Sequence, residues 1–197
     1  MRDDLIIAQI AESISVKQRI LTDAALIGLV EQVANECIAA YSRGNRVLLA
    51  GNGGSAADAQ HIAAEFVGRY GFDRPGLAAA AFTTDTSMLT AIGNDYGFER
   101  IFRRQLEANG RQGDVFIGIS TSGDSPNILG ALQSAREIGI ITVGLSGQGG
   151  GKMKALCDYC IQVPSTDTAR IQESHIMLGH IVCAIVEDRL FGGQAAQ

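Results

Sequence analysis

From residue 46 onward, short apolar runs alternate with longer segments that carry apolar residues at helical spacing. Each run is nearly continuous in apolar residues instead of alternating with polar ones. The five runs cover residues 46–50, 77–82, 115–119, 140–145 and 159–163. Strands of this kind are typical of a parallel sheet that helices bury on both faces. We therefore predict an α/β fold, a three-layer α/β/α sandwich with a five-stranded parallel sheet.

Residues 1–42 are predicted to form two helices, divided at Thr22 and Asp23, because their apolar residues recur at helical spacing. The first helix precedes any strand and carries an apolar stripe with no obvious place on the sheet. The stripe comprises Ile6, Ile7, Ile10 and Ile14. We expect this N-terminal helical pair to serve in oligomerisation. The length of 197 residues fits a single domain over residues 1–197.

The formal charge of −5 and a pI near 5.2, with no cluster of Lys or Arg, argue against a nucleic-acid groove or a membrane-surface patch. No apolar run approaches the ~20 residues that span a bilayer, and residues 1–4 resemble neither a secretory signal nor a transit peptide. A cytoplasmic protein is expected. The cysteines at 37, 157, 160 and 183 are then interpreted as buried thiols, with a redox or metal role for the C-x-x-C pair 157–160 as the alternative.

A glycine-rich turn joins the first strand to the next helix at residues 51–55. Glycines let the backbone approach a ligand, and the first N–H groups of a helix attract anions. Ser55 is expected to cap this helix. The spacing of Gly51, Gly53 and Ala56 also meets a relaxed dinucleotide-binding fingerprint, but no acidic residue ends the next strand. The lack of a lysine after the glycines argues against a P-loop.

A second polar turn, residues 120–125, follows a buried strand and precedes Pro126, which opens a helix. Four hydroxyl groups surround one glycine there. They can surround the oxygens of a phosphate group while backbone N–H groups supply further hydrogen bonds. The alternative is an ordinary helix cap, which requires only one hydroxyl group. We therefore predict a phosphate site at the carboxyl ends of the strands, where open parallel sheets bind ligands.

His61 and Glu65 lie four residues apart on the helix after the glycine turn, so they share one face. Gln172 and His180 are aligned on the final helix, predicted from about residue 168 to 191. With His61 and Glu65 they are candidates for a divalent metal site. The alternatives are a surface pair for His61 and Glu65 and a core residue for His180. The role of His175 is left open.

Six segments of the chain carry its most distinctive sequence motifs. They are residues 51–61, 69–70, 74–76, 89–97, 118–123 and 170–173. In sequence and order these segments resemble the phosphoheptose isomerase family of sugar-isomerase (SIS) domain proteins, and the similarity covers nearly the whole chain. It implies a flavodoxin-like SIS fold assembled as a homotetramer, with active sites between subunits.

The resemblance also implies an activity. It is that of an aldose–ketose isomerase converting sedoheptulose 7-phosphate to D-glycero-D-manno-heptose 7-phosphate through an enediol, the first step of bacterial ADP-heptose precursor synthesis. By position, Glu65 resembles the catalytic base and His180 the acid, and one zinc ion per subunit is implied on His61, Glu65, Gln172 and His180. The implied substrate contacts are Asn52, Gly53, Gly54, Ser55, Glu65, Asn94, Asp95, Ser120, Thr121, Ser122, Ser125 and Gln172.

Position 124 departs from the pattern of the phosphoheptose isomerase family. Many relatives have Asn where this chain has Asp124, and we expect that carboxylate to face away from the phosphate site.

The rival interpretation is a non-catalytic SIS-type regulator that binds phosphosugar and associates with the replication initiator. It resembles this chain in the glycine and serine loops but lacks counterparts of Glu65 and His180. Their presence favours an enzyme.

Overall fold

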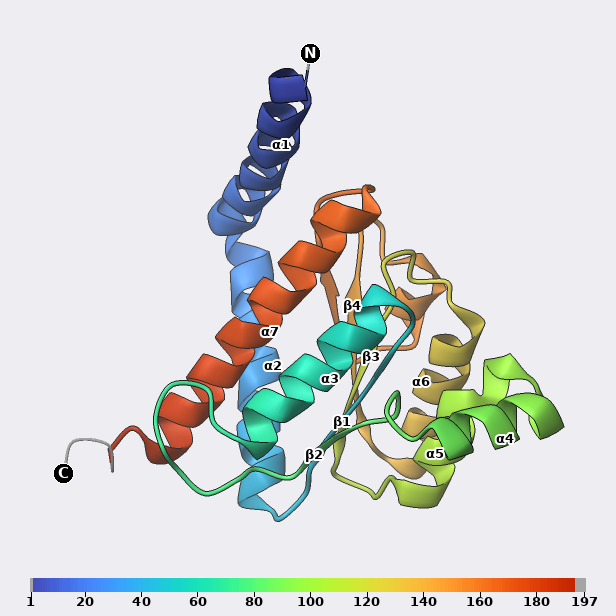
Figure 1. Ribbon diagram of the computed structural model, residues 1–197. Helices are drawn as coiled ribbons and strands as arrows, with labels where there is room; N and C mark the ends of the chain where they lie inside the picture. Colours follow the sequence, from blue (N-terminus) through green and yellow to red (C-terminus); the bar gives the residue numbers. More distant parts are fainter. Residues whose placement is uncertain (1, 194–197) are drawn as a thin grey trace.

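The computed structural model describes residues 2–193 and shows five parallel strands in one sheet (Figure 1). The strands are β1 (Val47–Gly51), β2 (Ala79–Ala81), β3 (Val115–Ile119), β4 (Ile141–Ser146) and β5 (Tyr159–Gln162). Their order in the sheet is β2-β1-β3-β4-β5. This is the flavodoxin-like order and not that of the dinucleotide-binding fold. The predicted α/β sandwich is confirmed.

Strand β2 is shorter than the sequence indicated. Residues 77–82 were expected to be extended, but only Ala79–Ala81 pair with β1. The N–H of Leu77 instead donates to the carbonyl of Phe66, at the end of the preceding helix, 3.0 Å away. A strand at the sheet edge has one neighbour, so its ends are free to make other contacts. The other strands lie within a residue of their predicted bounds.

Helices cover both faces of the sheet, as Figure 1 shows. One face carries α1 (Arg2–Thr22), α2 (Ala24–Ser42), α3 (Gly54–Val67) and α7 (Thr168–Phe191). The other carries α4 (Thr86–Tyr96), α5 (Ile101–Asn109) and α6 (Pro126–Ile138), with the short helices η1 (Phe98–Arg100) and η2 (Gly151–Ala155) beside them. None of the helices in the described part of the chain is long and apolar enough to cross a membrane.

The first helix projects beyond the sandwich (Figure 1). It is divided from α2 by Asp23, whose carboxylate accepts the N–H of Leu26 at 3.0 Å and caps α2 as a helix start requires. Its apolar stripe is exposed: Ile6, Ile7 and Ile10 are each more than half accessible. An exposed apolar stripe of this extent marks an interaction surface.

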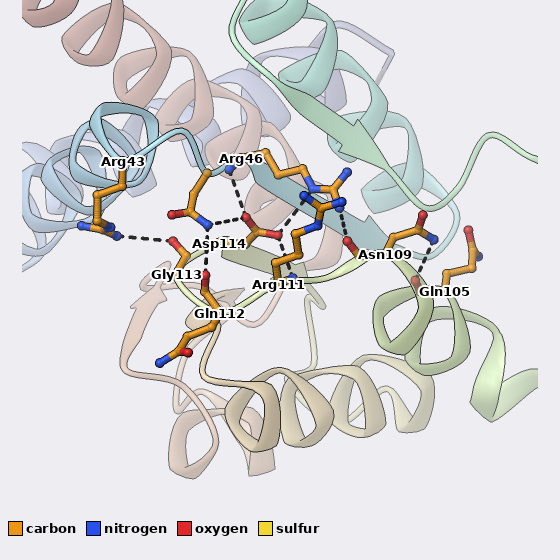
Figure 2. Close-up of polar contacts among 9 residues, drawn as sticks. Arg43, Arg46, Gln105, Asn109, Arg111, Gln112, Gly113 and Asp114 are labelled. Carbon is orange, nitrogen blue, oxygen red and sulfur yellow. Dashed lines mark hydrogen bonds and ion pairs between the residues drawn. The ribbon is translucent and has the colours of Figure 1, made fainter.

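The amino ends of β1 and β3 are tied together by one buried carboxylate, that of Asp114, which is 1% exposed (Figure 2). It accepts the backbone N–H groups of Arg46 and Arg111 at 3.2 and 3.0 Å. It also accepts the amide of Asn45 at 3.0 Å and pairs with the guanidinium of Arg46 at 3.4 Å. This network lies at the amino ends of the strands, whereas the glycine turn lies at the carboxyl end of β1.

Asp114→Asn is expected to lower the free energy of unfolding by about 2 to 3 kcal/mol, because the amide loses charge-assisted bonds and turns a donor toward a backbone N–H. Denaturant unfolding at fixed protein concentration measures the change. Asp124→Asn is the control, since the Asp124 carboxylate is exposed and accepts one backbone N–H, that of Lys152 at 3.1 Å. Equal losses for the two variants would contradict the role of Asp114.

Candidate active site

The glycine turn connects β1 to α3 at the carboxyl ends of the strands. Gly53 has a φ of 56°, in the left-handed region that favours glycine, and it is the N-cap of α3. No side chain caps this helix start. The expectation that Ser55 caps α3 is therefore wrong: the chain turns at Gly53, and Ser55 falls inside the helix, where it is buried. The uncapped N-terminus suits an anion.

The hydroxyl loop after β3 lies on the neighbouring strand, since β1 and β3 are adjacent in the sheet. The hydroxyl of Ser120 lies 2.9 Å from that of Ser125 and 3.4 Å from that of Ser122. Ser125 is the N-cap of α6, yet its side chain makes no capping bond. The capping alternative therefore does not account for these serines. Thr121 is half-buried in the same loop.

A reciprocal amide pair joins the two loops. Asn52 donates to Asn127 at 2.9 Å, and Asn127 donates to Asn52 at 2.8 Å. Asn127 is 2% exposed, and sequence reasoning did not select it. The available signal was its place directly after the proline that opens α6. The pair aligns the loops at the β1/β3 switch point, where flavodoxin-like sheets bind ligands.

The imidazoles of His61 on α3 and His180 on α7 meet, with their Nε2 atoms 2.9 Å apart. The Oε1 atom of Glu65 lies 3.2 Å from Nε2 of His61. All three ligand atoms lie within 4.8 Å of one another. Ligands on a tetrahedral metal with bonds of about 2.1 Å are about 3.4 Å apart, so this group can hold a metal ion with a small adjustment.

The surroundings of this group are partly open. The side chain of His61 is 51% exposed and that of Glu65 is 22% exposed, although Ile62 and Phe66 on the same helix are buried. The ring of Tyr70 lies 5.7 Å from the His180 ring, between centroids. A substrate can therefore reach the imidazoles from outside the sandwich.

Gln172 lies nearer the glycine turn. Its side-chain amide fills the space beside Gly54, where a Cβ would come within 2.6 Å of Nε2. A Cβ at position 54 would require the Gln172 side chain to move. Its contact with Gly54 brings the Gln172 amide to the uncapped start of α3.

Asn94 and Asp95 lie apart from these groups. They are exposed residues of α4, and the amide of Asn94 donates to Asp95 at 2.8 Å. Helix α4 packs against α5 and η1, on the side of the sheet away from α3 and α7 (Figure 1). Within one subunit, the structure does not bring these two residues to the imidazoles.

His175, whose role the sequence left open, is a core residue. It is fully buried, its Nε2–H donates to the carbonyl of Ser146 at 3.1 Å, and burial lowers its pKa to about 4.

Asp58, three residues before His61, was not selected from the sequence. Burial raises its pKa to about 6 against the opposing effect of His61. Asp124 is exposed, as expected.

The cysteines are free thiols. Cys37 and Cys183 are buried, whereas Cys157 and Cys160 of the C-x-x-C pair are only half-buried, contrary to the expectation for all four. Contact with the Cys157 thiol lowers the pKa of Cys160 to about 7. Among the described residues, neither thiol belongs to a cluster that could hold a metal ion.

Known proteins are similar to this chain in sequence and in fold. A model of the SIS domain family matches residues 11–147. The phosphoheptose isomerase of Aneurinibacillus thermoaerophilus is 64% identical over 189 residues, which cover 96% of each chain. Phosphoheptose isomerase 2 of Campylobacter jejuni is 65% identical over 182 residues, covering 92% of this chain and 90% of the relative.

Among solved structures, the phosphoheptose isomerase of Neisseria gonorrhoeae superposes with a TM-score of 0.89 at 44% identity, covering 95% of this chain and 100% of that chain. Sequence and backbone agree with that family over nearly the full length. The expected resemblance is confirmed: the chain belongs to the phosphoheptose isomerase family of SIS-domain proteins.

Proposed function

We propose that this protein is an aldose–ketose isomerase that converts sedoheptulose 7-phosphate to D-glycero-D-manno-heptose 7-phosphate. The observation that carries the proposal is the meeting of Glu65, His61 and His180 on two helices, one of which starts at the uncapped glycine turn. The family's named activity supports the same reaction.

The distance between the two parts of the site supports a sugar phosphate of this size. His61 is seven residues after Gly54 on α3, so the two are about 10 Å apart along the helix axis. This is comparable with the length of an extended seven-carbon chain. The glycine turn and the serines would bind the phosphate at C7 through N–H and hydroxyl groups, and the reacting C1 and C2 would then lie near Glu65 and His180.

The reaction moves one proton between C1 and C2 through an enediol. In our proposal the Glu65 carboxylate removes the carbon-bound proton and returns it to the neighbouring carbon, while His180 exchanges the proton of the oxygen. Asn52, held by Asn127, and the Ser120, Ser122 and Ser125 hydroxyls orient the sugar phosphate. Sugars without the phosphate group should therefore react poorly.

We infer that the metal-capable group binds one zinc ion per subunit, with His61, Glu65 and His180 as ligands. Gln172, the fourth ligand that the resemblance implies, lies against Gly54, about 12 Å along α7 from His180, so in this proposal it would have to come from a neighbouring subunit. Two imidazoles and a carboxylate are a donor set that zinc favours. When bound, zinc would polarise the carbonyl and diol oxygens of the sugar as a Lewis acid.

Metal removal is expected to lower kcat by at least about 100-fold, since Lewis-acid stabilisation is worth several kcal/mol. The measurement is the isomerase rate after chelation and dialysis, followed by addition of zinc, with circular dichroism to verify the fold. Full activity of the metal-free protein would reject the zinc role.

We further propose a homotetramer in which the N-terminal helical pair makes subunit contacts. The exposed stripe of α1 supports this. A second subunit would also allow Asn94 and Asp95 to contact a substrate that their own subunit does not bring near them. The sugar-phosphate substrate and the free cysteines favour a cytoplasmic location, and the product would enter the synthesis of ADP-heptose precursors.

The direct test is an assay of the purified protein with sedoheptulose 7-phosphate and zinc, in which the product is separated and identified as the aldose. We expect turnover that is lost with unphosphorylated sedoheptulose. The rival regulator would instead bind the sugar phosphate without converting it and would retain an initiator protein in a pull-down.

A further inference from the structure

A buried ion pair lies next to the proposed catalytic group, and the mechanism above does not use it. The guanidinium of Arg74 and the carboxylate of Glu187 are 3.0 Å apart, and their side chains are 2% and 3% exposed. Arg74 lies on the loop that follows α3, and Glu187 lies on α7. In Figure 1 this loop passes beside the C-terminal half of α7.

Glu187 binds the loop through its backbone. Its carboxylate accepts the N–H groups of Tyr70 at 2.8 Å, Gly71 at 2.5 Å and Phe72 at 3.4 Å. Burial alone would raise the pKa of Glu187, but these N–H groups and Arg74 outweigh it and lower the pKa. The carboxylate is thus ionised and holds Tyr70 where its ring lies against His180.

Arg74 binds the end of α3. Its guanidinium donates to the carbonyls of Glu65 at 2.8 Å, Phe66 at 2.7 Å and Gly68 at 3.1 Å. A cation at these last carbonyls is favourable for the helix. One of the carbonyls belongs to Glu65 itself, so the guanidinium contacts the backbone that carries the proposed base.

The pair therefore connects both helices of the site. Glu187 follows His180 by seven residues, about two turns, so both lie on the α3 side of α7. Arg74 contacts α3 at Glu65. A buried ion pair is weak evidence for a role in stability, since apolar residues of similar volume often stabilise as well or better.

We propose that Arg74 and Glu187 are positioning residues that set the separation of Glu65 and His61 on α3 from His180 on α7. The inference rests on the proposed function of those three side chains. Neither Arg74 nor Glu187 touches the sugar in this proposal. They act by fixing the backbone of Glu65 and the ring of Tyr70.

Glu187→Gln is the principal test, because it preserves volume but turns an amide donor toward backbone N–H groups. We expect kcat to fall at least about tenfold while KM changes less than about threefold, since small displacements at the reacting atoms are costly and the phosphate loops are untouched. If this variant does not fold, Arg74→Lys should lower kcat in the same way, because it retains the positive charge but loses the planar guanidinium that donates several hydrogen bonds at once.

The chain contains three histidines, so nitrogen NMR of the imidazoles gives a readout that does not depend on turnover. The His61 and His180 signals should shift in Glu187→Gln, while the signal of the core residue His175 should stay. Asp114→Asn is the matched control. It too replaces a buried carboxylate that accepts backbone N–H groups and pairs with an arginine, but at the far edge of the sheet (Figure 2).

For Asp114→Asn we expect lower stability, with kcat within about twofold of wild type below the unfolding temperature and imidazole signals in place. Glu187→Gln with unchanged kcat and unchanged imidazole signals would overturn the proposal. So would losses of kcat in both variants that only follow the folded fraction. A wild-type protein inactive on sedoheptulose 7-phosphate would refute the proposed function, yet the imidazole signals would still decide the positioning role.

Discussion

Replacing Glu65 with glutamine is expected to lower kcat for sedoheptulose 7-phosphate by at least about 10³-fold, with little change in KM. The amide preserves the shape of the side chain but cannot accept the carbon-bound proton, and a positioned base contributes up to about 10⁴-fold. The phosphate is bound by the loops after β1 and β3, so affinity should persist. Steady-state kinetics with product analysis measures the change.

Glu107→Gln is the matched control for this experiment. Glu107 also pairs with a basic residue four positions earlier on its own helix, Arg103 at 2.8 Å, but on the opposite face of the sheet. Its replacement should leave kcat within about twofold, as expected for surface ion pairs. If Glu65→Gln retained most of the wild-type rate, the base would have to be another residue.

Replacing His180 with glutamine is expected to lower kcat by about 10² or more. The substitution removes the imidazole that exchanges the oxygen proton, and it removes one of the three groups able to hold a metal ion. The phosphate site is on other elements, so binding of the sugar phosphate should be retained. The rate is measured with zinc in excess, which separates weaker metal binding from loss of the acid.

His175→Gln provides the control on the same helix. His175 is five residues earlier and donates to Ser146 within the core, a bond that a glutamine amide can still donate. We expect lower stability and an unchanged rate per folded molecule. If the rate losses at both histidines disappeared on normalisation to the folded fraction, both substitutions would act only through folding.

Much of the fold could be predicted from the sequence. The bounds of β3 and α7 agree with the predicted ranges, because a continuous apolar run and a long periodic segment are strong local signals. Weaker local signals gave errors. β2 is shorter because the end of α3 accepts the N–H of Leu77, and Ser55 is not a cap because Gly53 turns the chain first.

The sequence offered candidate site residues but not their arrangement. Local chemistry selected the hydroxyl loop, and helical spacing paired His61 with Glu65, whereas Asn52 was implied only by the family resemblance. No local pattern indicated that Asn127 would pair with Asn52, 75 positions earlier, or that the Gln172 amide would lie against Gly54. Such contacts depend on where separate elements pack.

By itself the sequence determined the strand–helix alternation, the two anion-binding turns and the residue types available for proton transfer, because these follow from local periodicity and side-chain chemistry. Only the tertiary structure decided which of them meet. The imidazoles of His61 and His180, 119 residues apart, converge because α3 and α7 pack side by side on one face of the sheet. The buried Arg74–Glu187 pair links the C-terminal end of α3 to α7. Long-range packing of this kind leaves no periodic trace in the chain.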